Sequence, residues 1–262
     1  MTQPLRVGIQ LASLRQPLAK AMETAARLGA DGVELDARHD VRPGELGETA
    51  RRHLRKKLDD YNLKVAAIAF PTRRGYEVAE DLDRRIDATK QAMRLAYDLG
   101  ARALLNYVGR IEDEGPGRDR LLQALEDIGR HGQHVGVWLC ATTGAESPER
   151  LRALIDELAP GSLAVNLDPG ALLVNDESPR EAVSQLGPWV QHVRASDGVR
   201  DFAKRQGIET QLGRGAADYP ELIAMLEEHR YSGYYTIQRL HATDPVAEIQ
   251  QSVNYLRALQ GN

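Results

Sequence analysis

Short apolar runs alternate with longer amphipathic segments along the whole chain, and this alternation most constrains the fold. Runs of about four to eight β-prone residues predict buried strands, and helical segments between them favour a parallel sheet with crossover helices. The predicted strands span residues 5–10, 31–36, 63–70, 103–107, 136–141, 162–168, 189–195 and 234–238. Eight strand-then-helix units without a linker predict an α/β protein, one (β/α)8 TIM barrel domain over residues 1–262.

The segments between the predicted strands carry helix signals. Residues 44–61 and 81–99 place apolar side chains at helical spacing, and Ser147 followed by proline predicts a helix start. Gly29 and Gly100 each precede a strand and predict left-handed helix ends. Further helices are predicted up to about residue 132 and near residues 220–228 and 245–259. An open doubly wound sheet is the alternative, but the chain lacks a glycine-rich dinucleotide fingerprint, which favours the barrel.

Composition narrows the classes of partner. The net charge is −4 and the pI is about 6.0, whereas nucleic-acid-binding domains are strongly basic, so no nucleic-acid partner is expected. Cys140 is the only cysteine, which excludes an intrachain disulfide and a thiolate metal cluster. No run approaches about 18 apolar residues and the first residues lack a signal-peptide pattern. We therefore expect a cytoplasmic protein without a membrane partner, and the oligomeric state stays open.

Polar residues stand at the ends of four predicted strands: Thr142, Asp168, Arg194 and Gln238. In a TIM barrel the functional face lies at the carboxyl ends of the strands and in the loops that follow them. Side chains alternate along a strand, so all four of these side chains can face the barrel axis at its top. We expect them to converge on one pocket, together with Glu34 at the end of the second strand.

The segments around these residues resemble the sugar phosphate isomerase/epimerase family, the xylose isomerase-like TIM barrels. Residues 139–149 (LCATTGAESPE) are similar to the family's L-x-x-E-T-G-x-E-S-P-E, and residues 192–197 (HVRASD) are similar to its H-V-H-A-x-D. Residues 166–170 (NLDPG), 212–215 (LGRG) and 236–239 (TIQR) are similar to further family motifs. The resemblance implies the TIM barrel fold, isomerase or epimerase chemistry in carbohydrate metabolism, and a sugar or sugar phosphate ligand.

In that family, the four strand-end positions carry Glu, Asp, His and Glu, which together bind one divalent metal. Here Thr142, Arg194 and Gln238 replace three of these ligands, and only Asp168 is retained. A hard divalent ion prefers several anionic or imidazole ligands, whereas the guanidinium of Arg194 is a permanent cation. The resemblance therefore implies a degenerate metal site, and we expect no bound Mg²⁺ or Mn²⁺ and no other cofactor.

The resemblance and the charges also suggest roles. Glu34 and Asp168 are the candidate proton-transfer residues, although Glu34 is equally interpretable as a helix N-cap or as the ion-pair partner of a nearby arginine. The candidate substrate-binding residues are Thr142, Arg194, Arg200, Gln238 and Asn106, and of these Arg200 matches a substrate-contacting arginine of ketose epimerases. We further expect Arg194 to pair with Asp168 in a bidentate contact, which would replace part of the lost metal charge.

Basic residues in the loops at this end predict attraction for an anionic ligand. They are Arg73, Arg74, Arg110, Arg200, Lys204, Arg205 and Arg214. The connection at residues 196–218 is long, which is typical of a binding loop. Two functions stay open: a metal-free isomerase/epimerase-like protein that acts on or binds a small carbohydrate, and a non-catalytic ligand-binding or regulatory pseudoenzyme. The replaced carboxylates favour the pseudoenzyme, and the intact architecture favours the enzyme.

Overall fold

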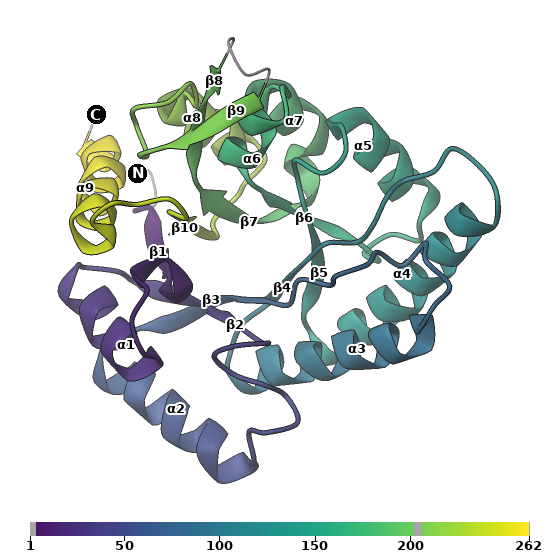
Figure 1. Cartoon of the computed structure of the whole chain (residues 1–262), viewed down its shortest axis with the longest axis horizontal. Coiled ribbons are helices and arrows are strands. Elements are labelled where there is room, and N and C mark those ends of the chain that lie inside the picture. Colours follow the sequence, from purple (N-terminus) through teal and green to yellow (C-terminus); the bar gives the residue numbers. More distant parts are fainter. Residues whose placement is uncertain (1–3, 202–205, 262) are drawn as a thin grey trace.

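Eight parallel strands close into a barrel in this computed structural model, which describes residues 4–201 and 206–261 (Figure 1). The strands are β1 (Arg6–Gln10), β2 (Gly32–Asp36), β3 (Lys64–Ala69), β4 (Ala103–Asn106), β5 (Trp138–Thr142), β6 (Ala164–Leu167), β7 (Val190–Ala195) and β10 (Tyr234–Ile237). Strand β1 pairs with both β2 and β10, which closes the sheet and excludes the open doubly wound alternative. The predicted TIM barrel is therefore confirmed.

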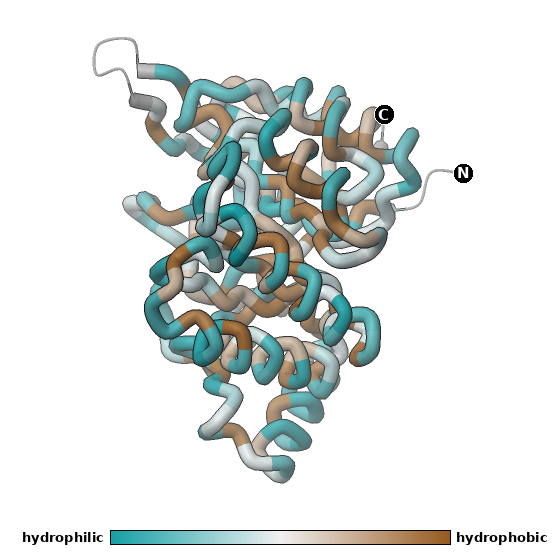
Figure 2. The backbone as a smooth tube through the Cα atoms, turned by 90° about the vertical axis from the view of Figure 1, so that its right-hand side faces the viewer, coloured by the Kyte–Doolittle hydropathy of each residue, from teal (hydrophilic) through white to brown (hydrophobic). Residues whose placement is uncertain are grey.

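Helices follow the strands and form the outer layer of the barrel (Figure 1). They are α1 (Leu18–Arg27), α2 (Glu48–Asp60), α3 (Leu82–Asp98), α4 (Pro116–Val135), α5 (Pro148–Glu157), α6 (Pro169–Val174), α7 (Pro179–Leu186), α8 (Tyr219–Glu228) and α9 (Pro245–Ala258). Short 3-10 turns cover Leu11–Leu14, Gly187–Trp189 and Leu259–Gly261. Hydrophobic and hydrophilic turns alternate along the helices, because one face packs on the barrel and the other meets water (Figure 2).

The predicted helix-capping residues lie at helix ends in the structure. The Ser147 side chain accepts a hydrogen bond from the backbone N of Arg150 and caps α5, and proline follows at the first helical position. Gly29 and Gly100 adopt φ of 83° directly after α1 and α3, a left-handed conformation that glycine tolerates without a steric penalty.

The connection between β7 and β10 contains a hairpin that the sequence patterns do not predict. Strands β8 (Asp197–Asp201) and β9 (Gln206–Thr210) pair in antiparallel fashion and stand beside α6 at the edge of the barrel (Figure 1). The backbone of β9 approaches α6 closely, since a Cβ on Gly207 would lie 2.4 Å from Cα of Val174. The hairpin therefore forms part of the wall at this end of the barrel.

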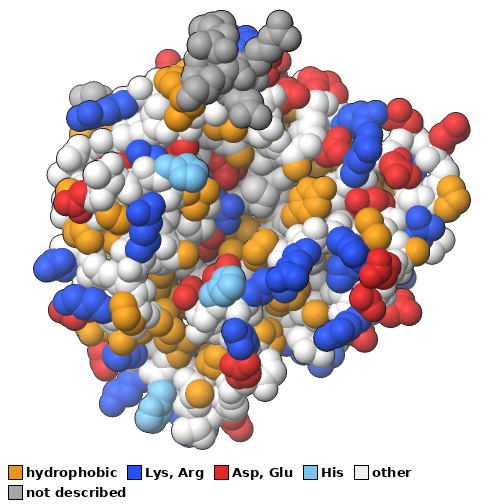
Figure 3. Space-filling model, viewed as in Figure 1, with side chains coloured by type: hydrophobic (Ala, Val, Ile, Leu, Met, Phe, Trp, Pro, Cys, Tyr) orange, Lys and Arg blue, Asp and Glu red, His pale blue; other side chains and the backbone are white. Residues whose placement is uncertain are grey.

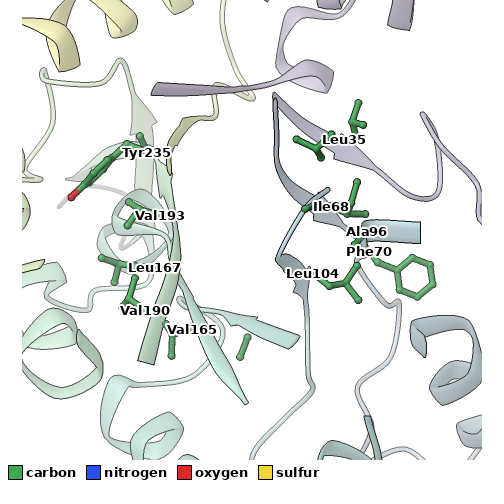
Figure 4. Close-up of a cluster of buried hydrophobic side chains, with 14 of the residues drawn as sticks. Leu35, Ile68, Phe70, Ala96, Leu104, Val165, Leu167, Val190, Val193 and Tyr235 are labelled. Carbon is green, nitrogen blue, oxygen red and sulfur yellow. The ribbon is translucent and has the colours of Figure 1, made fainter. Parts of the chain in front are cut away.

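Two apolar layers hold the barrel together. The outward-facing side chains of the strands pack under the helices, as Leu35, Ile68 and Leu104 do on one side and Val165, Leu167 and Val193 on the other (Figure 4). Inside the barrel a small separate cluster unites Ala67, Ala103, Leu105, Cys140 and Ala164. Residues alternate along each strand, so the positions further along on the inward face form the next layer, where polar side chains replace apolar ones.

Candidate active site in the barrel mouth

A guanidinium lies between two buried carboxylates at the carboxyl ends of β2, β6 and β7. Arg194 donates from Nη2 to Glu34 Oε1 over 2.8 Å, and its Nη1 lies 3.8 Å from Asp168 Oδ2. The side chains of Glu34 and Asp168 are 1% and 5% exposed, so this charge cluster is shielded from water. Arg194 therefore points into the barrel, where the strand alternation predicts it.

The predicted bidentate contact between Arg194 and Asp168 is wrong. The guanidinium approaches Asp168 through one nitrogen at 3.8 Å, and its close partner is Glu34. The reason is competition for the carboxylate: Asp168 Oδ1 already accepts hydrogen bonds from Ser196 Oγ and from the backbone N of Ala171. Glu34 thus forms the ion pair with an arginine that was one of its interpretations, and its role in proton transfer stays a prediction.

Glu34 is positioned by the neighbouring strand β1. Gln10, its register partner, donates from Nε2 to Glu34 Oε1 over 2.8 Å, and Ser13 Oγ donates to Gln10 Oε1 over 2.8 Å. Both contacts to the carboxylate, from Gln10 and from Arg194, thus fall on Oε1. Glu34 Oε2 is buried and has no hydrogen-bond partner within residues 4–201 and 206–261, and the same holds for Arg194 Nε.

Asp168 caps helix α6 while facing the mouth. Its backbone N donates to Thr143 Oγ1 over 2.9 Å, and its Oδ1 accepts from the backbone N of Ala171 over 3.0 Å. Burial raises the pKa of Asp168, and this desolvation outweighs the opposing effects of Arg194, Ser196 and Ala171. The carboxyl group thus holds a proton more readily than an exposed aspartate does.

A row of hydrogen-bonded side chains follows the inner wall of the barrel along the neighbouring strands β5, β6, β7 and β10. Asn166 donates from Nδ2 to Thr142 Oγ1 over 3.1 Å, His192 Nδ1 lies 2.8 Å from Asn166 Oδ1, and His192 Nε2 lies 2.9 Å from Thr236 Oγ1. Burial and the nearby Arg194 lower the pKa of His192 to about 3, so the imidazole is neutral. This pattern assigns the proton to Nδ1, since Asn166 presents its oxygen and Thr236 can donate to Nε2.

The remaining predicted site residues are not all brought together. Gln238 lines the same cleft as Asp168, directly after β10. Asn106 lies apart: its neighbour Leu105 belongs to the interior cluster, so Asn106 faces the outer layer, where its Nδ2 donates to the backbone O of Phe70 over 2.7 Å. Arg200 lies on β8, exposed, where it forms an ion pair with Asp176.

A cleft of about 380 Å³ adjoins the charge cluster on the side of the hairpin. It is lined by Asp168, Gly170, Ala171, Val174, Asn175, Ser196, Gly207, Ile208, Glu209, Gln238, Leu240 and His241. Ile208 and Leu240 are 45% and 52% exposed, so this lining presents two large apolar side chains to an entering ligand. The face seen in Figure 3 is hollowed near its centre, where acidic and basic side chains meet.

Glu209 fastens the hairpin to the loop after β10. Its carboxylate accepts hydrogen bonds from the backbone N of Leu240 (2.8 Å) and of His241 (2.9 Å) and pairs with Arg239 (2.9 Å). Arg239 in turn pairs with Glu248 on α9 over 2.8 Å. We call the contacts of Glu209 with Leu240, His241 and Arg239 the hairpin clip.

The predicted basic rim is partly neutralised. Arg74 forms an ion pair with Glu80, as Arg200 does with Asp176. Lys204 and Arg205 lie outside the described residues.

Sequence reasoning missed Gln10, Ser13 and Ser196, which orient the two carboxylates. A signal was present for Gln10, because a polar residue that ends an otherwise apolar strand in a TIM barrel stands at the functional face. Ser196 directly follows β7 in the same way.

Within the described residues, no group of three or more His, Cys, Asp or Glu side chains is placed to hold a metal ion. The helices of the described parts of the chain include none long and apolar enough to cross a membrane.

Known proteins share this architecture. Residues 22–259 match the family described as xylose isomerase-like TIM barrel, and no curated protein matches the chain. Three solved structures are similar. A xylose isomerase domain protein from Planctomyces limnophilus has 21% identity, 98% of each chain covered and a TM-score of 0.84. A xylose isomerase-like TIM barrel protein from Mycobacterium smegmatis, in complex with magnesium, has 17% identity, 99% of this chain and 97% of that chain covered, and a TM-score of 0.81. A sugar phosphate isomerase/epimerase from Parabacteroides distasonis has 17% identity, 98% and 95% covered, and a TM-score of 0.75.

These likenesses, all below 25% identity, show the fold. The family match extends over most of the sequence and includes every residue of the charge cluster. The protein belongs to the xylose isomerase-like TIM barrel family, as its sequence motifs predicted.

Proposed function

We propose that the barrel mouth binds a small carbohydrate, or a related hydroxyl-rich or anionic ligand, with the guanidinium of Arg194 in place of a divalent metal. The observation that carries this proposal is the position of Arg194 between Glu34 and Asp168. Arg194 Nε and Glu34 Oε2 are buried without partners in the described part of the chain. Buried polar atoms are normally hydrogen-bonded, so a donor and an acceptor here have unused capacity for ligand hydroxyl groups.

The residues at this position do not fit a divalent metal. Asp168 is the one ligand-type residue left among the four strand ends, and its Oδ2 lies 3.8 Å from Arg194 Nη1. Thr142 and Gln238 are neutral and offer weak ligands. A metal bound to Asp168 would meet the full charge of the guanidinium at close range in a buried setting, where charges interact strongly.

The two carboxylates and the guanidinium can support proton transfer on a bound sugar. Isomerisation or epimerisation begins when a base removes the proton from the carbon next to a carbonyl, and negative charge then develops on the carbonyl oxygen. Glu34 Oε2 would accept that proton, Asp168 in its protonated form would give one to the oxygen, and Arg194 would stabilise the developing charge. In an isomerisation, Asp168 then takes the proton from the hydroxyl group on the first carbon, which becomes the new carbonyl, and Glu34 returns its proton to the neighbouring carbon. Both carboxyl groups thereby regain their starting protonation, and the isomer is formed.

The similarity to a sugar phosphate isomerase/epimerase supports a sugar or sugar phosphate as the ligand class. Composition and family membership favour a role in cytoplasmic carbohydrate metabolism. The apolar side chains of Ile208 and Leu240 in the adjoining cleft favour a ligand with an apolar edge beside its hydroxyl groups.

A non-catalytic ligand-binding or regulatory protein is the second candidate. The contacts of Glu34 Oε1 with Arg194 and Gln10 favour it, because they hold the carboxylate against the protein and restrict its approach to a ligand.

The test uses protein treated with a chelator and a panel of ketoses and ketose phosphates in D₂O. Ligand-observed NMR measures binding, and loss of the carbon-bound proton signal measures exchange. We expect binding without added metal, lost in Arg194→Met and retained in Arg73→Met, a change at an exposed rim arginine. Exchange that depends on Glu34 identifies an enzyme, and binding without exchange identifies the second candidate. Binding that requires added Mg²⁺ or Mn²⁺ would contradict the proposal.

A further inference from the structure

A second and larger cavity, of about 630 Å³, lies at the opposite end of the barrel from the mouth. It is formed by the first residues of several strands and by the loop after α8, and the proposed sugar site does not involve it. Its lining includes the cations Arg6, Lys64, Arg102 and Arg230 and the ring side chains Trp138, His229, Tyr231 and Tyr234.

The charged side chains that line this cavity are all basic. The four cations stand at β1, at β3, directly before β4 and in the loop after α8; they are Arg6, Lys64, Arg102 and Arg230. The residues that line the cavity include no Asp or Glu. The chain as a whole has a net charge of −4, so positive charge is concentrated here against the overall balance. Cations gathered in one concave surface focus the potential and attract anions.

Two of these cations are not neutralised by the protein. Lys64 pairs with Asp59 over 2.8 Å, and Arg6 lies over the Tyr234 ring at 5.7 Å from its centroid. Arg102 and Arg230, in contrast, make no side-chain hydrogen bond or ion pair with any residue of 4–201 and 206–261. Arg230 also adopts φ of 60°, the left-handed region that non-glycine residues rarely occupy.

We propose that this cavity binds a small phosphate-bearing anion, at a site separate from the barrel mouth. The planar guanidinium presents several donors that match the oxygens of a phosphate group, and Arg102 and Arg230 supply two such groups with unused donors. Trp138, which is 36% exposed, and Tyr234 offer aromatic surfaces on which the organic part of a phosphate ester can pack.

Trp138 makes the site observable because it lines the cavity. The second tryptophan, Trp189, is flanked by the lining residues Pro188 and Val190 but is not itself part of the lining, and its ring lies beneath Arg152, so the Trp138→Phe variant separates the two signals. Inorganic phosphate and phenyl phosphate are titrated at constant ionic strength, with tryptophan fluorescence and calorimetry as readouts. We expect saturable binding up to about 10 mM ligand, and a fluorescence change that disappears in Trp138→Phe. Tighter binding of phenyl phosphate identifies an ester as the ligand, and tighter binding of inorganic phosphate identifies the free ion.

The double variant Arg102→Met/Arg230→Met is expected to weaken phosphate binding at least about tenfold. Arg52→Met/Arg84→Met removes the same charge from exposed positions on α2 and α3 and is expected to leave it unchanged. Sugar binding at the barrel mouth should survive in both. Equal weakening by the two double variants, or heats of binding that do not saturate, would overturn the proposal, because phosphate would then respond only to overall charge.

Discussion

Arg194 on β7 donates to Glu34 on β2 over 2.8 Å, and the two strands stand three positions apart in the barrel order. The contact therefore spans the barrel interior instead of joining neighbouring strands. It connects residues 160 positions apart in the sequence, so it forms only once the barrel has closed.

We expect Arg194→Met to destabilise the protein by about 3 to 5 kcal/mol near neutral pH, because it leaves two buried carboxylates without their cation. Urea denaturation measures the change. The loss should shrink in acid, where protonated carboxyl groups no longer need a counter-charge. Arg73→Met, at an exposed position, should stay within about 0.5 kcal/mol of the native protein. A small and pH-independent loss in Arg194→Met would show that the ion pair contributes little.

The raised pKa of Asp168 predicts a pH-dependent effect of Asp168→Asn. A carboxyl whose folded pKa is raised binds its proton more tightly in the folded state, so its contribution falls as pH rises from 3.8 through the folded pKa. Asparagine can still cap α6 and accept from Ser196. The stability of Asp168→Asn relative to the native protein should therefore be higher at about pH 7 than at about pH 4 in urea titrations. The reverse order would mean that Arg194 outweighs burial.

His192 should stay neutral in the folded protein across the whole neutral range. Its pKa falls from 6.5 to about 3, so its contribution to stability is present above pH 6.5 and is lost as pH falls toward 3. Imidazole ¹⁵N spectra should show the Nδ1-protonated form at about pH 5.5 in the folded state and the charged form in urea. A charged imidazole in the folded protein at that pH would contradict the assigned network.

Restoring the family's ligands should restore metal binding. The variant carries Thr142→Glu, Arg194→His and Gln238→Glu, together with Ala171→His at the position where the resemblance implies a substrate-binding histidine. It should bind Mn²⁺ by calorimetry, since it supplies anionic and imidazole ligands and removes the guanidinium. The matched control carries the other three changes and keeps Arg194, and it should bind at least about tenfold more weakly. Equal Mn²⁺ affinity in the two variants would remove Arg194 from the explanation.

The hairpin clip predicts local protection from hydrogen exchange. Glu209→Ala removes the acceptor of the Leu240 and His241 backbone amides, and both should exchange faster by roughly the factor expected for one lost hydrogen bond of about 1 kcal/mol. Glu221→Ala, which breaks the exposed pair with Arg180, should leave these two amides unchanged. Unchanged exchange in Glu209→Ala would show that the clip is open in solution.

The barrel fold could be predicted from the hydrophobic periodicity and the sequence motifs, because the alternation of apolar runs with amphipathic segments indicates strands and helices. The predicted ends of the strands then indicate the functional face. The same rule placed Arg194, Asp168 and Thr142 correctly on the inward face. Asn106, a predicted substrate-binding residue, ends the strand β4 but faces the outer layer, because its neighbour Leu105 occupies the inward side.

The sequence patterns could not predict that Arg194 pairs closely with Glu34 and not with Asp168. Alternation gives the side of a strand on which a residue lies, but the pairing depends on the distance across the barrel and on which carboxylate oxygens are already occupied. The hairpin β8–β9 was missed for a related reason. Its strands are short and polar, and β9 is held by packing on α6 and by the contacts of Glu209 instead of by a hydrophobic pattern of its own.

The hairpin clip has a consequence for selectivity. Ile208 and Glu209 on β9 and Leu240 and His241 after β10 all line the cleft, and the clip ties these two segments directly to each other. The clip therefore fixes the relative position of these two segments, and the width of the cleft stays the same when a ligand enters. Two ligands that differ by one bulky substituent should therefore differ in binding affinity, because the protein does not widen the cleft to admit the larger one.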